Sequence, residues 1–135
     1  MVESSSSILQ GWPAKAKSYE LITAIGMGSF GLVWKARCLT GPHQSLDVAI
    51  KVVDLEQFQD NSIEEIRKEI SIMSTCHHKN VISCYVSFIE DSDLWLVMPV
   101  LGAGSCADIM KINCPGGIKS EAVIATIIKE TLLGL

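Results

Sequence analysis

The segments Gly26-Met27-Gly28-Ser29-Phe30-Gly31-Leu32-Val33 and Val48-Ala49-Ile50-Lys51 carry the strongest structural signal in this chain. Glycines at these spacings let backbone N–H groups approach phosphate oxygens, because no Cβ stands in the way. The lysine supplies a compact positive charge on a flexible stem for the same phosphates. Together the two segments predict a loop that covers nucleotide phosphates and a lysine that contacts them.

The residues after the glycines separate this interpretation from the dinucleotide-binding loop of a Rossmann unit, which has the same glycine spacing. In a Rossmann unit the third glycine opens a helix, and an acidic residue about 20 positions further on binds the ribose. Here the residue about 20 positions after Gly31 is Lys51 rather than an acidic residue. Residues 32–38 alternate as in a strand, with Leu32, Trp34, Ala36 and Cys38 on one face and Val33, Lys35 and Arg37 on the other. We therefore predict that the loop connects two strands.

The residues around this loop predict five strands. Turn residues such as Gly41-Pro42-His43-Gln44 separate the apolar or alternating runs that carry the strand signal. In the third strand Ala49 and Lys51 share one face, and Val33 on the neighbouring strand can close the same apolar slot. The predicted strands are residues 19–25, 32–38, 46–53, 81–89 and 94–98.

A helix is predicted between the third and fourth strands. It runs from Asn61 or Ser62 to about Ser74, with Ser62 as the N-cap. Its apolar residues repeat at helical spacing and form a single stripe, which favours packing of one face on a core. The stripe consists of Ile63, Ile66, Ile70 and Met73.

One glutamate of this helix is a candidate partner of Lys51. Glu69 projects from the edge of the apolar stripe rather than from the opposite face, so we assign it to an ion pair with Lys51. The alternative for Glu69 is a solvated helical charge. We give that second interpretation to Glu64, which has Lys68 four residues further on.

Two further helices are predicted after the last strand. Ser105 and Asp108 form a capping box for a helix that runs to about Ile112, and ribose contact is the alternative role for this pair. Ser120 caps the last helix, which is apolar over a broad face. The apolar residues of that helix are Val123, Ile124, Ile127, Ile128, Leu132, Leu133 and Leu135.

From about Tyr19 to the last residue, the order of these elements resembles the eukaryotic protein kinases. The segments 76–80, 94–98 and 104–105 resemble the sterile-20-related serine/threonine kinases, and within these the fray and oxidative-stress-responsive branch. One departure is Lys79, where the family usually has proline. The resemblance implies an α+β fold with a kinase N-lobe, built from a five-stranded antiparallel sheet and one helix, followed by a hinge and the first helices of a C-lobe.

The resemblance also implies a function. Such a protein transfers the γ-phosphoryl group of ATP to protein hydroxyls, with Lys51 and Glu69 as catalytic residues and Met98 at the back of the adenine pocket. Pro99 has no N–H, so Val100 or Leu101 would donate to the adenine edge. The implied ATP-binding residues are Ile25, Gly26, Met27, Gly28, Ser29, Phe30, Gly31, Val33, Ala49, Lys51, Met98, Val100 and Leu101.

The sequence also departs from the kinase pattern at its end. It reaches Leu135 before any H-R-D catalytic loop or D-F-G metal motif, so the expected Mg²⁺ has no ligands in these residues and we expect no kinase activity from them alone. The alternative function is a catalytically silent nucleotide-binding or scaffold module, which engages another kinase through the exposed last helix and the Glu69 helix. The expected organisation is a disordered leader at 1–17, an N-lobe with hinge at 18–101, and the start of a C-lobe at 102–135.

Composition indicates which classes of partner and which cellular compartment to expect. A net charge of −4 without a basic stripe argues against nucleic acid, and the apolar run at 94–101 is too short to span a bilayer. Residues 1–17 have no signal-peptide pattern. The five cysteines are odd in number and lack C-x-x-C spacing, which favours reduced thiols in a cytoplasmic protein. The cluster Cys76-His77-His78 lacks a convergent fourth ligand, so no metal site is expected.

Overall fold

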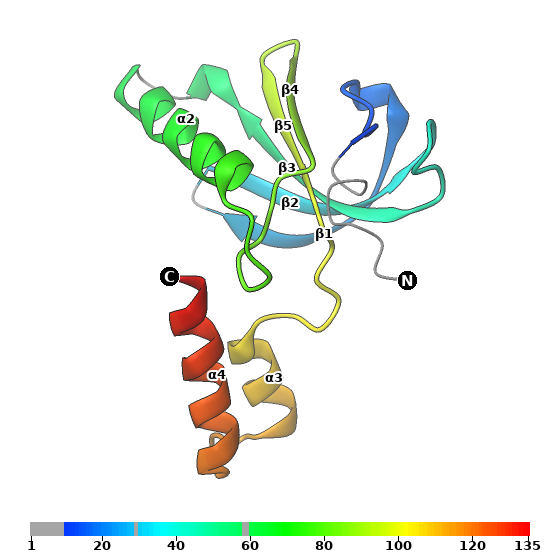
Figure 1. Cartoon of the computed structure of the whole chain (residues 1–135). Helices are drawn as coiled ribbons and strands as arrows, with labels where there is room; N and C mark the ends of the chain where they lie inside the picture. Colours follow the sequence, from blue (N-terminus) through cyan, green and yellow to red (C-terminus); the bar gives the residue numbers. More distant parts are fainter. Residues whose placement is uncertain (1–9, 29, 58–59) are drawn as a thin grey trace. The chain divides into compact units, whose positions relative to one another are not determined.

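The computed structural model describes residues 10–28, 30–57 and 60–135, and it separates into two compact units (Figure 1). The first unit extends up to His77 and includes Ile82–Val100. The second unit consists of His78–Val81 and Leu101–Leu135. The candidate site lies in the first unit.

The first unit contains a five-stranded antiparallel sheet with the strand order β1-β2-β3-β5-β4. Helix α2 (Asp60–Thr75) and the 3-10 turns η1 (Ala16–Ser18) and η2 (Leu55–Gln57) accompany it. This arrangement confirms the α+β fold and the kinase-like N-lobe expected from the sequence. The strands are β1 (Tyr19–Gly28), β2 (Gly31–Cys38), β3 (Asp47–Asp54), β4 (Val86–Glu90) and β5 (Asp93–Met98).

The sheet has an apolar cluster on each face, because neighbouring residues of a strand point to opposite sides. On the face that α2 covers, Ile66 of the helix packs with partly buried Ile70 and Met73 against the sheet residues Ala49, Val53, Leu94, Leu96 and Met98. On the opposite face, the cluster consists of Trp12, Tyr19, Ala36, Cys38, Val48, Ile50 and Val97. Lys51 is on the helix-covered face, since it alternates with Ala49 and Val53 on the same side of β3.

The strand predicted over residues 81–89 is wrong in its first half. β4 begins at Val86; just before it, Tyr85 still bonds to β5, but the N–H of Cys84 bonds to α2. Cys84 N–H donates to the carbonyl of Met73 at the end of α2, 3.5 Å away, and Tyr85 N–H donates to Val97 at 2.7 Å. The β-branched and aromatic residues of this segment favoured a strand, but its position beside the helix end prevents a continuous ladder with β5.

The segment expected to be a leader, residues 1–17, includes one residue of the core. Residues 1–9 lie outside the described residues, whereas Trp12 packs in the cluster on the sheet face opposite α2. Trp12 is only 8% exposed, and its ring stacks on His43 at 4.1 Å and on Tyr85 at 4.5 Å between ring centroids. Tyr19 Oη donates to the Pro13 carbonyl at 2.7 Å, and burial of this hydroxyl raises the Tyr19 pKa. The polar composition of residues 1–17 gave no sign that Trp12 would be buried.

The second unit contains helices α3 (Cys106–Asn113) and α4 (Glu121–Gly134). Ser105 is the N-cap of α3 and forms the predicted capping box with Asp108, because each side chain accepts a hydrogen bond from the other residue's N–H at 3.1 Å. The hydroxyl and backbone N–H of Ser105 lower the Asp108 pKa. Ser120 caps α4, as predicted, by accepting from Val123 N–H at 3.4 Å. Within the described residues, no helix has the length and apolar character needed to cross a membrane.

Candidate functional site

The Lys51 ammonium forms the centre of the candidate site. Its Nζ lies 3.5 Å from Oε1 of Glu69, and the lysine side chain is 13% exposed while that of Glu69 is 43% exposed. β3 brings Lys51 to the helix-covered face, and Glu69 follows buried Ile66 by almost one turn, so it reaches the sheet from the edge of the apolar stripe. An ion pair of this exposure contributes at most about 1 kcal/mol of stability. Its main effect is to hold the ammonium in one direction.

The glycine-containing hairpin lies directly beside this ammonium. Gly28 closes the β1–β2 pairing opposite Gly31, and a Cβ built on Gly28 would lie 3.2 Å from Lys51 Cε and 3.5 Å from Nζ. The Phe30 ring centroid is 5.5 Å from the same Nζ. The missing side chain at Gly28 therefore keeps the space next to the ammonium free for an anionic group. Ser29, which was also assigned to this loop, lies outside the described residues.

An apolar surface continues from Lys51 along the same sheet face. Val33 is the cross-strand partner of Lys51, and Ala49 is the partner of Met98. Ala49 and Met98 are 4% and 8% exposed, and half-buried Val33 and Val100 pack in the same cluster. The structure thus brings together four of the residues that were assigned to ATP binding: Val33, Ala49, Met98 and Val100.

Three other assigned residues are not part of this cluster. Ile25 and Met27 on β1 are 48% and 84% exposed, and Ile25 falls at an irregularity of the β1–β2 register between Ala24 and Gly26. Leu101 belongs to the second unit and is 67% exposed. The remaining loop glycine, Gly26, is in open surroundings, since a Cβ added there would meet only the Val33 side chain, at 3.9 Å.

Other charged groups on α2 have structural partners. Glu64 pairs with Arg67 at 3.4 Å, three residues on, rather than with Lys68 as predicted. Both side chains of this pair are more than 60% exposed, at 64% and 73%, which agrees with a solvated role. In the described ranges, no group of three or more His, Cys, Asp or Glu side chains could hold a metal ion, and all five cysteines are free.

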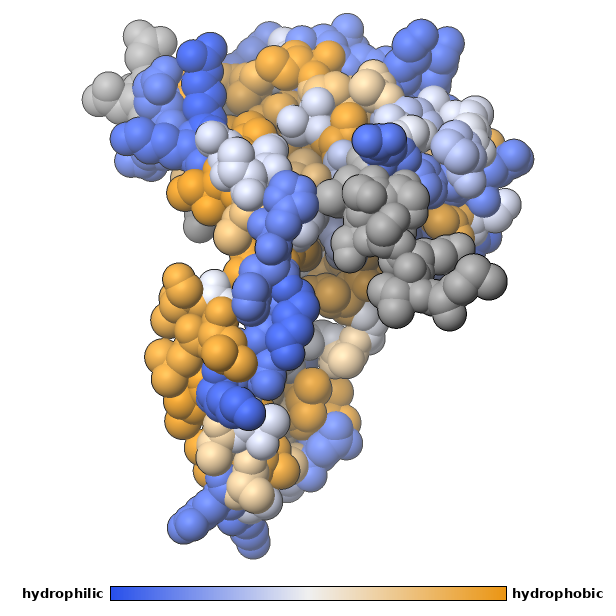
Figure 2. All heavy atoms as spheres, viewed as in Figure 1, coloured by the Kyte–Doolittle hydropathy of each residue, from blue (hydrophilic) through white to orange (hydrophobic). Residues whose placement is uncertain are grey.

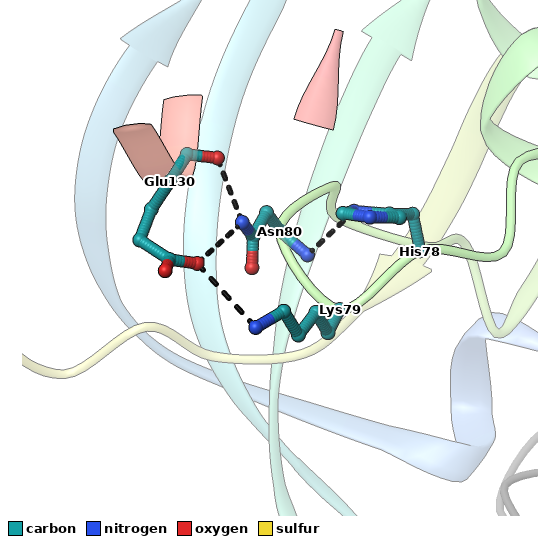
Figure 3. A network of polar contacts seen from close by, with 4 residues as sticks. All are labelled: His78, Lys79, Asn80 and Glu130. Carbon is teal, nitrogen blue, oxygen red and sulfur yellow. Dashed lines mark hydrogen bonds and ion pairs between the residues drawn. The ribbon is translucent and has the colours of Figure 1, made fainter. Parts of the chain in front are cut away.

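Sequence interpretation missed a polar network in the second unit (Figure 3). Asn80 Nδ2 donates to both the backbone carbonyl and the carboxylate of Glu130 on α4, each at 2.7 Å. Asn80 N–H donates to His78 Nδ1 at 3.1 Å, and Lys79 Nζ lies 3.5 Å from the Glu130 carboxylate. The Asn80 bond, assisted by Lys79, lowers the Glu130 pKa. Lys79, the departure from the family pattern, therefore adds an ion pair to this network.

Replacing Asn80 with alanine is expected to destabilise the second unit by about 1 kcal/mol, because the Glu130 carbonyl loses its side-chain donor. The measurement is urea unfolding followed by far-UV circular dichroism. Lys79→Ala is the matched control, since it removes only an ion pair whose lysine is 72% exposed. An unfolding midpoint for Asn80→Ala equal to that of Lys79→Ala would contradict the role given to the amide.

Comparisons with known proteins agree with this geometry. Residues 19–135 match the family model described as the protein kinase domain. Serine/threonine-protein kinase fray2 of Dictyostelium discoideum is 50% identical over 123 residues, which are 91% of this chain and 12% of that protein. Serine/threonine-protein kinase fray1 of the same organism is 42% identical over 127 residues, with 94% and 21% coverage. Germinal center kinase 3 of Caenorhabditis elegans is 40% identical over 132 residues, with 92% and 22% coverage. The chain thus spans between 12% and 22% of the length of these curated relatives.

Proposed function

This chain belongs to the protein kinase domain family, and from that membership we propose that it is the ATP-binding part of a protein serine/threonine kinase. The resemblance predicted from the sequence, including that to the fray kinases, is confirmed by the matches. The observation that carries the proposal is the position of the Lys51 ammonium, which is oriented by Glu69 on one side and lies beside the side-chain-free Gly28 on the other.

The residues present fit a nucleoside triphosphate. A Cβ at Gly28 would occupy the space next to the ammonium, so the glycine leaves room there for phosphate oxygens. Lys51 binds those oxygens, while Ala49, Val33 and Met98 offer an apolar surface to a planar base. Of the two expected donors to the base edge, Val100 belongs to this unit and packs in the same cluster. ATP, when bound, supplies the phosphoryl group that is transferred to a hydroxyl.

The same residues do not fit a complete catalytic centre. The described residues contain no carboxylate cluster for Mg²⁺, so no step is assigned to a metal here. The sequence up to Leu135 also contains no H-R-D or D-F-G motif, which the phosphoryl-transfer template needs for the base and the metal ligands. We propose that residues 1–135 by themselves bind nucleotide without transferring phosphate.

A second candidate function is a catalytically silent nucleotide-binding or scaffold module that engages another kinase. It is favoured by the apolar side chains on the surface of α4, which Figure 2 shows as an orange area along that helix. Exposed Ile128, Leu132 and Leu133 are 54%, 63% and 51% accessible, and surfaces of this kind mark interaction sites.

Lys51→Met is expected to weaken ATP binding about tenfold, because methionine is unbranched and only one atom shorter than lysine but lacks the ammonium that contacts phosphate. A titration with fluorescent ATP measures the affinity. Glu64→Ala is the control and should bind like the wild type, since the Glu64–Arg67 pair is exposed and away from Lys51. Equal affinities of the wild type and Lys51→Met would remove the lysine from the proposed site.

A further inference from the structure

A cavity lies mainly on the sheet face opposite Lys51. It has a volume of about 480 Å³, and its lining consists of Phe30, Gly31, Leu32, Trp34, Val52, Asp54, Gln57 and Asp93. Leu32 and Val52 are cross-strand partners, as are Asp54 and Asp93, so the four side chains share one side of the sheet. The sheet therefore lies between these four side chains and Lys51, while the cavity borders the glycine-containing loop at Phe30 and Gly31.

The size and lining of this cavity suit a small, elongated group. Its volume is within the range of about 300–1,000 Å³ that small-ligand sites occupy in proteins. The floor is aliphatic and aromatic, because Leu32, Val52 and Trp34 line it. An alkyl stem or a planar group can pack on such a floor.

The charged residues of the lining favour a ligand with a positive charge. Asp54 and Asp93 are both acidic, and none of the lining residues is a lysine, arginine or histidine. The Asp54 oxygens already accept from Glu56 N–H at 2.9 Å and from Gln57 Nε2 at 2.7 Å. Among the described residues, no hydrogen bond or ion pair involves the Asp93 carboxylate. Asp93 is therefore the acceptor that a ligand can use.

We propose that this cavity binds the side chain of an arginine presented by a peptide. A guanidinium is planar, so it can donate two parallel hydrogen bonds to the Asp93 carboxylate. Its three-carbon stem then packs against Val52 and Leu32, and the peptide beside the arginine reaches the Trp34 indole, which lines the same cavity further along β2. A lysine ammonium does not offer this pair of parallel donors. The proposal does not use the nucleotide site, since Asp93, Val52 and Leu32 lie on the sheet face opposite Lys51; of the lining residues, Phe30 is the one whose ring is near the Lys51 ammonium.

The test titrates the ¹⁵N-labelled chain with acetyl-Ala-Ala-Arg-Ala-Ala-amide and with the same peptide carrying citrulline, the uncharged isostere of arginine. The chain contains three tryptophans, whose indole N–H signals are resolved separately by NMR. Trp34 is the one that lines the cavity, while Trp12 is buried in the stack with His43. We expect a saturable shift of the Trp34 signal with the arginine peptide and none with the citrulline peptide. A Trp34→Phe variant assigns the signal.

Asp93→Asn is expected to weaken binding of the arginine peptide about tenfold, because it removes a charge-assisted contact. Asp91→Asn is the matched control: it makes the same charge change two residues away, outside the cavity, at a positive φ of 55° that asparagine also adopts. Lys51→Met should still show the Trp34 shift with the arginine peptide. The peptide result can therefore be interpreted even if the nucleotide proposal fails. Equal shifts with both peptides, equal affinities of the wild type and Asp93→Asn, or no Trp34 shift at all would overturn the arginine site.

Discussion

Replacing Gly31 with alanine is expected to destabilise the first unit by about 3 kcal/mol, one of the two largest effects anticipated for this chain. A Cβ at Gly31 would lie 2.2 Å from the carbonyl oxygen and 3.2 Å from the carbonyl carbon of Val52, both in the backbone of β3. Backbone in a sheet cannot move aside as a flexible side chain can. In addition, the Gly31 φ of 155° is a conformation that residues with a Cβ rarely adopt.

Urea unfolding monitored by tryptophan fluorescence measures this effect, with Gly26→Ala as the control. A Cβ at Gly26 would meet only the Val33 side chain at 3.9 Å, which is an ordinary contact distance. Gly26→Ala should therefore unfold close to the wild type, while Gly31→Ala unfolds at a much lower urea concentration. If the two variants unfold together, the close approach of β2 and β3 at Gly31 is not a constraint on the fold.

The glycines of the loop meet different neighbours, so Gly28 and Gly31 are required for different reasons. Gly31 is required by strand packing against Val52, whatever the ligand. Gly28 instead faces the flexible end of Lys51, where a side chain would be tolerated by the fold but would fill the space beside the ammonium. The sequence pattern predicted both as phosphate contacts, because spacing alone does not show which neighbour each glycine meets.

Features with a short-range physical cause were predictable from the sequence. Strand alternation at 32–38, the capping box of Ser105 and Asp108, and the edge position of Glu69 each depend on local periodicity or local hydrogen bonding. The five-stranded sheet followed from the order of these signals together with the family resemblance.

Features that depend on distant partners were not predictable in the same way. Asn80 and Glu130 are 50 positions apart, and no local pattern joins them. The backbone of Cys84 bonds to the end of α2 instead of continuing a strand, although its neighbours have strand-forming side chains. Likewise, the capture of Trp12 by His43 and Tyr85 needs the finished sheet, since its partners come from the β2–β3 connection and from the residue before β4.

Trp12→Ala is expected to destabilise the first unit by about 3 kcal/mol, since it removes a large aromatic side chain that is 8% exposed from the cluster opposite α2. The loss extends beyond the ring. Trp12 holds residues 10–17 on the sheet, where the Ala16 N–H donates to the Glu90 carboxylate and the Pro13 carbonyl accepts from Tyr19. Without the ring, the cost of ordering this segment is no longer offset by apolar burial.

Thermal unfolding followed by circular dichroism compares Trp12→Ala with Trp12→Phe, which keeps an aromatic ring for stacking and should recover much of the lost stability. Unfolding of Trp12→Ala at the wild-type temperature would show that the segment contributes nothing to the core. The family match begins at residue 19, so residues 10–18 lie outside it. A large loss of stability would therefore place the beginning of this folded unit before the family boundary, because part of the sheet's apolar face is covered by residues that the kinase pattern does not include.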